Sequence, residues 1–403
     1  MLEGKTIVLG VTGSIAAYKT AYLASALKKE RADVHVIMTR NACQFITPVT
    51  FETLTGNKCM VDTFDRNFKF DVAHISLAKA ADLILVAPAS ADFLAKAAHG
   101  IADDMLTTVL LAATCPKLVS PAMNTAMYEN PITQDNLAKL RHYGFKIIEP
   151  ASGLLACGDT GKGKMPEPAA LLEAVLREAV TPKDFAGLKV LVTAGPTQEA
   201  IDPVRYITNH SSGKMGYAIA RMAQYRGAEV TLVSGPVSIE APEGVTLVPV
   251  TSAAEMHDAV LERLAETDLL FKAAAVADYT PVTTYDQKVK KKDGDLSIPL
   301  KRTLDILGDV AKARRDDQVI CGFSMETENL LENSRGKLAR KHLDMICANS
   351  LRTEGAGFGV DTNVVTVITQ EDVTELGKMS KLDTADRILT IANKLYREKL
   401  HQI

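Results

Sequence analysis

Residues 6–14 (TIVLGVTGS) and 189–197 (KVLVTAGPT) decide the fold, because each is a β-branched apolar run that ends in a glycine turn. An apolar run of this kind is typical of a strand buried on both faces of a parallel sheet. A glycine turn at the end of such a strand leaves backbone N–H groups free to bind a phosphate. The chain therefore begins the same architecture twice, and we expect two sites for phosphorylated ligands.

Strand and helix patterns alternate after each of these stretches, which is typical of an α/β protein with doubly wound parallel sheets. The expected strands are 6–9, 34–38, 83–87, 117–120, 146–148, 189–193, 229–234, 269–275, 319–323 and 345–348. The expected helices include 15–28, 133–143, 169–179 and a terminal helix at 381–400, and 363–369 with 373–376 resembles a hairpin. The pattern predicts a first domain at 1–180, a linker at 181–187 and a second domain at 188–403.

Composition and charge indicate which kinds of molecule the protein binds. The 403 residues carry a formal net charge of -3 and are 47% hydrophobic, so nothing in the charge would attract nucleic acid or a bilayer over long range. The first residues lack a long apolar run, and six cysteines show no paired C-x-x-C spacing. We expect a cytoplasmic protein with reduced thiols and small-molecule substrates.

The first glycine turn, 10–17 (GVTGSIAA), places Gly13 and Ser14 where a helix begins. Alone, this motif fits an ordinary strand-to-helix turn as well as a phosphate site. Thr39 and Ser90 follow the next two predicted strands, so hydroxyl groups recur at three strand ends that form one crevice. The third glycine of a dinucleotide fingerprint is missing, which favours a mononucleotide such as FMN.

Three more residues of this half have reactive side chains. His74 begins a predicted helix, Asn124 follows a strand end, and Cys157 lies among four glycines in 153–165. A structural histidine and an Asx turn are the alternatives for the first two. Four glycines around a thiol favour a flexible functional flap over a buried core cysteine.

Together, GVTGSIAA, the His74 helix, Pro-Ala-Met-Asn-x-x-Met at 121–127 and the Cys157 flap resemble the homo-oligomeric flavin-containing cysteine decarboxylases. Over about residues 4–175 the chain is similar to phosphopantothenoylcysteine decarboxylase. The resemblance implies FMN at a subunit interface, His74 as acid or base, Asn124 as the ligand of the substrate carboxylate and Cys157 as proton donor. It also implies oxidation of the cysteine side chain to a thioaldehyde, which supplies an electron sink for loss of CO2.

The second glycine turn opens a polar segment, 195–216, that leads into a helix near Met215. Ser212 and Gly213 can form an anion-binding helix start, with Lys214 as added charge, although a plain surface loop is the alternative. Asp278 ends a buried strand, and lysines follow at 288 and 290–292. A carboxylate near lysines suits Mg2+ and a triphosphate, whereas a lysine run alone is more often a solvated face.

These residues resemble phosphopantothenate-cysteine ligase, and the whole chain resembles the bacterial bifunctional enzymes of coenzyme A biosynthesis. The resemblance implies that Asn209 stabilises an acyl-cytidylate and that Arg205, Ser212, Gly213 and Lys214 bind substrate. It implies CTP contacts, with Mg2+ at Asp278, from the following residues: Ala273, Ala274, Asp278, Lys288, Asp305, Phe323, Lys337 and Lys341.

Two positions depart from the family's usual pattern. Thr303-Leu304-Asp305-Ile306 replaces Asn-Pro-Asp-Ile, and Lys272 stands where a small residue is common. We expect both departures to alter the affinity of the protein for the nucleotide. Two other functions stay open at this point: an oxidoreductase with a separate nucleotide-binding module, which the missing fingerprint disfavours, and a non-catalytic regulatory scaffold, which the presence of His74, Asn124 and Cys157 disfavours.

Overall fold

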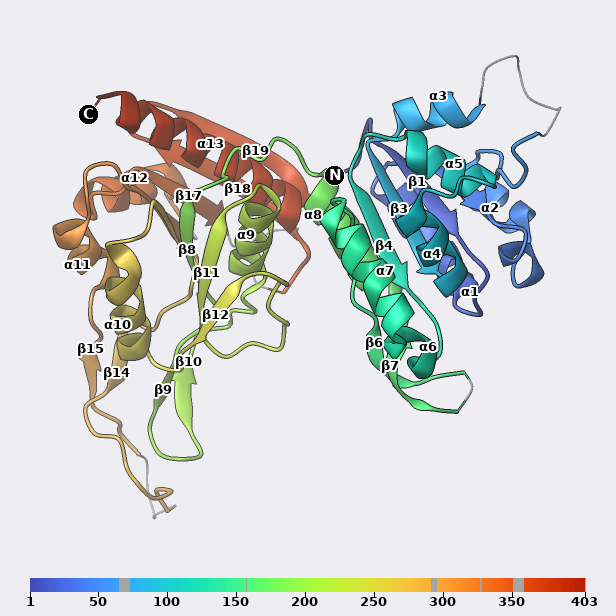
Figure 1. The fold of residues 1–403 in the computed structure, drawn as a ribbon. Helices are drawn as coiled ribbons and strands as arrows, with labels where there is room; N and C mark the ends of the chain where they lie inside the picture. Colours follow the sequence, from blue (N-terminus) through green and yellow to red (C-terminus); the bar gives the residue numbers. More distant parts are fainter. Residues whose placement is uncertain (65–72, 157, 291–295, 327, 351–358, 403) are drawn as a thin grey trace. The chain divides into compact units, whose positions relative to one another are not determined.

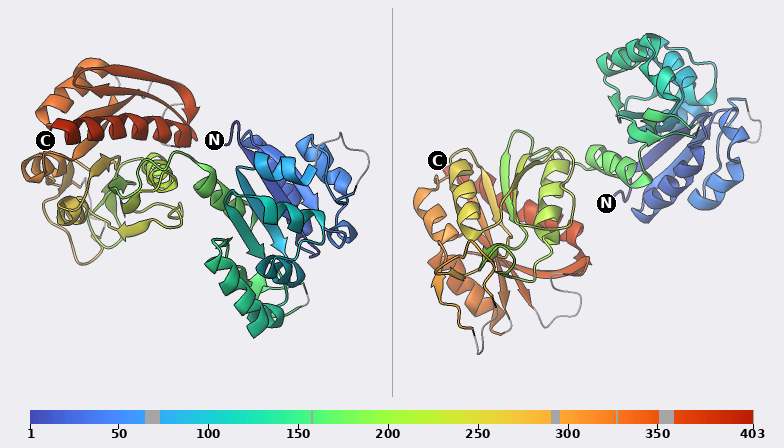
Figure 2. Two further views of the ribbon diagram at one scale, coloured as in Figure 1. Left: turned by 45° about the horizontal axis from the view of Figure 1, so that its top comes forward. Right: turned by 90° about the horizontal axis from the view of Figure 1, so that it is seen from below.

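The two glycine-terminated stretches form buried inner strands, each in a sheet of its own. A computed structural model describes residues 1–64, 73–156, 158–290, 296–326, 328–350 and 359–402. The chain divides into two units, Met1–Thr181 and Pro182–Ile403. In each unit helices cover both faces of the main sheet (Figures 1 and 2), which confirms the predicted doubly wound α/β class.

The first unit is built on five parallel strands in the order β2-β1-β3-β4-β5. These strands are β1 (Thr6–Val11), β2 (Asp33–Met38), β3 (Leu83–Ala89), β4 (Lys117–Pro121) and β5 (Lys146–Ile147). The helices are α1 (Ala17–Lys29), α2 (Pro48–Thr55), α3 (Ala73–Ala80), α4 (Ala91–His99), α5 (Met105–Ala112), α6 (Thr125–Glu129), α7 (Pro131–His142) and α8 (Pro168–Ala179), with a short 3-10 helix η1 (Ala42–Gln44). An antiparallel hairpin of β6 (Ala151–Leu154) and β7 (Thr160–Lys164) follows β5.

One core of this unit packs α3, α4, α5 and α7 on one face of the sheet. Val8, Val86 and Val119 from the strands belong to one buried cluster with Phe93 and Leu106 from the helices. Burying such side chains stabilises the fold by roughly 1.5–3 kcal/mol each. The sheet is therefore held rigidly, and its carboxyl edge is a fixed platform for polar loops.

The second unit has an eight-stranded sheet in the order β12-β11-β8-β13-β16-β17-β18-β19, with β18 and β19 antiparallel to their neighbours. Its strands are β8 (Lys189–Ala194), β11 (Glu229–Ser234), β12 (Thr246–Pro249), β13 (Leu269–Lys272), β16 (Val319–Glu326), β17 (Met345–Ser350), β18 (Thr362–Thr369) and β19 (Val373–Ser380). Two small antiparallel pairs stand apart from it, β9 (Gln198–Ala200) with β10 (Tyr206–Thr208), and β14 (Tyr279–Pro281) with β15 (Leu300–Arg302). The helices are α9 (Lys214–Tyr225), α10 (Ala253–Leu264), α11 (Ile306–Ala313), α12 (Leu330–Arg340) and α13 (Lys381–Gln402).

Helices α10, α11 and α12 share one core on this sheet. Val260, Ile306 and Leu338 from the helices pack with Leu270 and Ile320 from the strands. Helices α9 and α13 lie against each other elsewhere in the unit (Figure 2). The C-terminal ends of β8, β13 and β16 therefore lie between these packed helices.

The predicted strand 269–275 is wrong over its last three residues, because β13 ends at Lys272. Beyond Lys272 the backbone no longer follows the strand, and its N–H groups donate to the end of β8 and to the loop after it. The N–H of Ala274 donates to Oγ1 of Thr193 at 3.2 Å, and the N–H of Ala275 donates to the carbonyl of Gly195 at 2.9 Å. The residues expected to contact a nucleotide thus lie in a fixed loop.

The predicted linker, 181–187, contributes side chains to the second unit. Phe185 is fully buried, and the Arg226 guanidinium at the end of α9 lies 4.8 Å from its ring centroid. Arg226 is 4% exposed and forms a bidentate pair with Asp184 at 2.9 and 2.7 Å. The same guanidinium donates to Asp386 on α13 at 3.0 Å, so one residue joins the start of the unit to α9 and α13.

We predict that Arg226→Met will destabilise the second unit by about 3 kcal/mol, because it leaves the partly buried Asp184 carboxylate without its cation. Burial opposes ionisation of Asp184, yet the hydrogen bond and charge of Arg226 hold its pKa below the usual value. Lys394→Met on α13 is the matched control, since Lys394 is 78% exposed and its pair with Glu398 spans 3.7 Å. Calorimetric unfolding of the full chain would contradict this account if both variants shifted the transition equally.

Two candidate active sites

At the carboxyl edge of the first sheet, hydrogen bonds from Thr12 and to Val11 join the ends of three strands. The Thr12 hydroxyl donates to the carbonyl of Pro88 at 2.8 Å and accepts from the N–H of Ser90 at 2.9 Å. The N–H of Thr39 donates to the carbonyl of Val11 at 3.0 Å. Gly13 allows the turn to approach the segment after β2, since a Cβ there would lie 2.6 Å from Cβ of Asn41.

Ser14, Thr39 and Ser90 each use the hydroxyl oxygen to accept a backbone hydrogen bond. Their donors are the N–H groups of Ala16 at 3.4 Å, Ala42 at 3.3 Å and Phe93 at 3.3 Å. A hydroxyl that accepts in this way keeps its own proton for another acceptor. Helix α1 also has no acidic residue in its first turn, so the edge suits the phosphate of a mononucleotide such as FMN.

A cavity of about 490 Å3 lies beside this edge. Ser14 and Tyr18 line one side, and Asn124 lines it together with Leu154 and Met165. We call the β6–β7 hairpin, residues 151–164, the flap. The cavity thus brings Ser14 and Asn124 together under the flap, whereas Gly13, Thr39 and Ser90 lie along the sheet edge outside its lining.

Asn124 begins α6, and its side chain is already engaged. Oδ1 accepts from the N–H of Ala126 at 2.8 Å, and Nδ2 donates to Oδ2 of Asp159 at 2.9 Å. Oδ1 therefore caps the helix, as in the Asx alternative, while the amide nitrogen faces a carboxylate. The Asn124 amide is oriented as a carboxylate ligand, and in this structure the flap itself provides the carboxylate.

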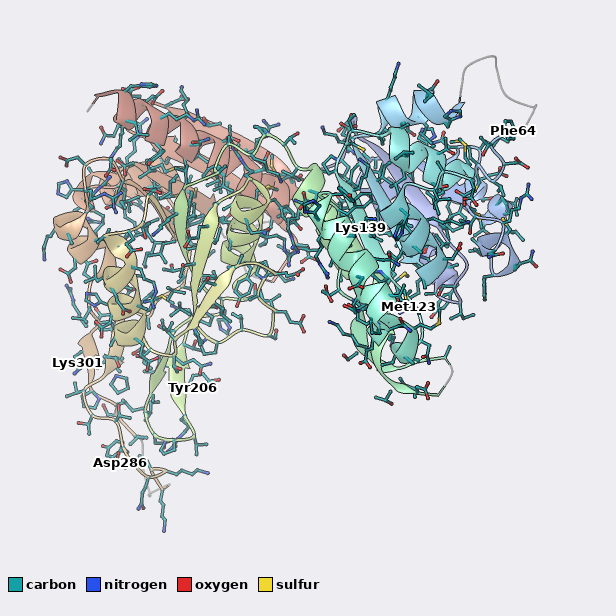
Figure 3. All side chains as sticks on the ribbon, viewed as in Figure 1. Phe64, Met123, Lys139, Tyr206, Asp286 and Lys301 are labelled. Atoms are coloured by element: carbon teal, nitrogen blue, oxygen red, sulfur yellow. The ribbon has the colours of Figure 1, made fainter. Side chains whose placement is uncertain are left out.

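Two glycines let the flap lie directly on the 123–125 segment, near Met123 in Figure 3. A Cβ on Gly163 would lie 2.3 Å from the carbonyl oxygen of Met123, and a Cβ on Gly161 would lie 2.6 Å from Oγ1 of Thr125. The N–H of Met123 donates to the carbonyl of Gly163 at 3.1 Å. Glycine is needed at 163 also because its φ is +144°.

His74 is the second residue of α3, as predicted, and is half-buried. It is absent from the lining of the flap cavity. Cys157 lies outside the described residues; its neighbour Ala156 lines the cavity. The structure therefore describes the position of the flap but not that of the thiol.

In the second unit the loops after β8, β10 and β13 are bonded together. Nδ2 of Asn209 donates to the carbonyls of Ala275 at 3.0 Å and Val276 at 3.2 Å. The N–H of Ala277 donates to Oγ1 of Thr197 at 3.0 Å. Asn209 is exposed, and it must exchange one of its two bonds before it can donate to an oxyanion.

Two cavities open at this edge. The α9 cavity, about 270 Å3, contains Ser212, Gly213 and Lys214 at the start of α9. Ala273, Ala274 and Phe323, all predicted nucleotide contacts, line the same cavity. Gly213 has a φ of +76° and its N–H donates to Oγ of Ser211 at 3.3 Å, so the turn into α9 is fixed.

The α11 cavity, about 400 Å3, contains Asp305 and Lys341, which form an ion pair. Asp305 also caps α11 through the N–H of Gly308 at 3.1 Å. Burial opposes its ionisation, but Lys341 and Gly308 hold its pKa below the usual value. Asp278 and Lys337 line this cavity and the α9 cavity. Seven of the eight predicted nucleotide contacts, all except Lys288, therefore line these two cavities.

Lys288 and Arg205 line neither cavity. Lys288 is exposed on residues 282–290, which we call the strap; Figure 3 labels Asp286 on it and Tyr206 on the nearby hairpin. The Arg205 guanidinium donates to Oδ2 of Asp202 at 3.0 Å through Nε and to the carbonyl of Val289 at 2.8 Å. Arg205 thus holds the strap in this structure.

Sequence reasoning missed Asp202 and Asp159. Asp202 is buried and accepts from the backbone N–H groups of Val204, Arg205 and Val289 at 2.9, 2.9 and 3.1 Å, so Arg205 and these donors keep its pKa low. The Asp202-Pro203 pair in a polar loop was a usable signal, because an aspartate in a turn often accepts from backbone N–H groups two residues further on. Asp159 lies two residues after Cys157, but its bond to Asn124 joins positions 35 apart and needs the fold to be seen.

Among the described residues, no three His, Cys, Asp or Glu side chains gather as a metal site. No helix in the described part of the chain is long and apolar enough to cross a membrane.

The chain matches two family models, "Flavoprotein" over residues 1–180 and "DNA/pantothenate metabolism flavoprotein C-terminal domain" over residues 185–395. It is 47% identical to the coenzyme A biosynthesis bifunctional protein CoaBC of Bacillus subtilis (strain 168) over 393 residues, 96% of this chain and 97% of the relative.

Two solved structures resemble its parts. The C-terminal domain of a coenzyme A biosynthesis bifunctional protein CoaBC is 40% identical, covers 54% of this chain and 100% of its own, and has a TM-score of 0.47. The FMN-dependent cysteine decarboxylase SpaF is 34% identical, covers 45% of this chain and 100% of its own, and has a TM-score of 0.39. From the two family models and the near full-length identity, the chain belongs to the family of bifunctional coenzyme A biosynthesis proteins.

Proposed function

We propose that the second unit ligates cysteine to 4'-phosphopantothenate with CTP, and that the first unit decarboxylates the product to 4'-phosphopantetheine. The observation that carries this proposal is the presence of two separate polar sheet edges on a chain of this family, one under a flap and one lined by lysines. The product of one site is the substrate of the other. Cytoplasmic location is part of the proposal, since all substrates are small and water-soluble.

In the ligation, the start of α9 holds the phosphate of phosphopantothenate through Ser212, Gly213 and Lys214. The loop at 273–274 and Phe323 receive the nucleotide base, and Lys337 and Lys341, with Lys288 from the strap, hold the triphosphate. Asp278 shares Mg2+ with the phosphates. These groups orient the pantothenate carboxylate towards the α-phosphorus and exclude water from it.

The ligation chemistry balances without a redox partner. A carboxylate oxygen forms a bond to the α-phosphorus of CTP, and pyrophosphate leaves with the electron pair of the broken bond. The cysteine amine then attacks the acyl carbon, loses a proton, and releases CMP. Asn209 stabilises the carbonyl oxygen in both steps as a neutral donor, after exchanging a bond to Ala275 or Val276.

In the decarboxylation, the Asn124 amide binds the substrate carboxylate once Asp159 withdraws from it. FMN, held by Ser14, Thr39 and Ser90, supplies reversible hydride acceptance when bound. The flap closes over the substrate, and Cys157 on it returns a proton at the end of the cycle.

We infer that His74 acts on a substrate held mainly by another subunit of a homo-oligomer. It belongs to α3, and it does not line the cavity that contains Asn124 and Ser14 of its own chain. A flavin site at a subunit interface supplies His74 from the neighbouring copy. A neighbouring copy that supplies this residue would account for the absence of His74 from the described lining of that cavity.

Gly163→Ala is expected to lower decarboxylation of supplied phosphopantothenoylcysteine at least tenfold, because the added methyl group would overlap the carbonyl of Met123 and lift the flap. Ligation on the same chain should be unchanged. Thr160→Val, an exposed position of the same strand, is the matched control. Normal CO2 release by Gly163→Ala would show that flap contact is not required.

Asn209→Ala is expected to reduce CTP-dependent ligation by about a hundredfold, the usual effect of removing one oxyanion donor. Decarboxylation of supplied phosphopantothenoylcysteine should remain. Asn333→Ala removes another side-chain amide that donates to a carbonyl, that of Glu328 at 3.0 Å, away from both cavities, and should ligate normally. A parallel loss of both activities in Asn209→Ala would argue against two independent sites, and an inactive wild-type protein would favour a regulatory scaffold.

A further inference from the structure

Lys272 ends the inner strand of the second sheet. Strand β13 lies between β8 and β16, where Lys272 is in register with Thr193 and Gly322. Since side chains alternate along a strand, Lys272 shares a face with Leu270, which packs in the core beneath α10, α11 and α12. Placing a lysine ammonium group at the edge of an apolar core costs free energy unless a polar or charged group pairs with it.

The α9 and α11 cavities meet at this side chain. Lys272, Val276, Asp278 and Lys337 line both cavities. Beyond these shared residues, the α9 cavity contains the start of α9 and Phe323, and the α11 cavity contains Asp305 and Lys341. The middle part of a ligand that spans both cavities would therefore lie beside Lys272.

The other lysines of the two cavities have partners. Lys337 donates to the carbonyl of Phe323 at 2.8 Å, Lys341 pairs with Asp305, Lys214 pairs with Asp361 at 2.7 Å, and Lys381 donates to the carbonyl of Thr362 at 2.9 Å. Lys272 makes no hydrogen bond or ion pair with any residue that the structure describes.

The surroundings of Lys272 disfavour its charge in the free protein. Burial and then repulsion by Lys337 lower its pKa to about 8, although Asp278 and Asp305 act in the opposite direction. An anion placed beside Nζ would favour the charged form and offset the cost of burial. The position is thus built for an anionic ligand between the two cavities.

We propose that Nζ of Lys272 binds the inner phosphate of the nucleotide, the one bonded to the ribose, and neutralises it during attack by the carboxylate. This rests on the proposed ligase function, in which the base lies towards Ala274 and Phe323 and the outer phosphates lie towards Lys341. The middle of such a nucleotide is the inner phosphate. When the acyl oxygen bonds to this phosphorus and pyrophosphate departs, the lysine keeps its proton and supplies positive charge to the non-bridging oxygens.

The test compares wild type, Lys272→Met and Lys272→Arg as full-length proteins. Met keeps the length of the side chain without its charge, and Arg keeps the charge. Calorimetric titration with cytidine, CMP and CTP separates the contacts, because CMP adds the inner phosphate alone to cytidine. We expect Lys272→Met to bind CMP at least tenfold more weakly but cytidine unchanged, and to ligate with a lower kcat; Lys272→Arg should recover part of both.

Lys312→Met, at a lysine of α11 that is 79% exposed, is the control and should match wild type in every titration. Unchanged binding of cytidine would show that the second unit of Lys272→Met folds. Equal weakening of cytidine binding and CMP binding would indicate a structural role for Lys272. Weakening of CTP binding alone would place the lysine at the outer phosphates. Either result overturns the proposal. A wild-type protein that neither binds CTP nor ligates would instead remove the proposed function itself.

Discussion

The structure depends on one constraint, the polarity of parallel strands. All carboxyl ends of a parallel sheet meet at one edge, where the backbone leaves the ladder and its polar groups need other partners. In the first unit Thr12 satisfies such groups across β1 and β3, and in the second Thr193 and Gly195 satisfy those of the loop after β13. Fixing these loops positions both candidate sites.

In each unit a carboxylate holds a further segment in place. In the first unit Asp159 on the flap bonds to Asn124, the group that we propose for the substrate carboxylate. In the second, buried Asp202 binds Arg205 and the N–H of Val289, which fixes the strap that carries Lys288. The flap contact occupies a proposed ligand group, whereas the strap contact is buried away from both cavities. Under that proposal the first contact breaks when substrate binds, whereas the second can persist.

The sequence predicted what depends on local pattern. Buried runs such as 189–193 and 229–234 became strands within one residue of their expected bounds, and the glycine turns lie at strand ends as expected. The end of β13 was missed because its alanines are as apolar as the strand and leave it through long-range bonds to Gly195. The short pairs β9–β10 and β14–β15 were missed because three-residue strands give little periodicity. Among the predicted site residues, Lys337 and Asp278 gather at two cavities, while the contacts of Arg205 with Asp202 and Val289 required the folded chain.

The central claim is that one chain carries two sites in series. Mass spectrometry of the products from purified protein, 4'-phosphopantothenate, cysteine, Mg2+ and CTP, with an ATP reaction in parallel, tests it most directly. The account predicts 4'-phosphopantetheine and CMP in the CTP reaction. Accumulation of phosphopantothenoylcysteine by flavin-loaded protein, or no product with either nucleotide, would contradict it.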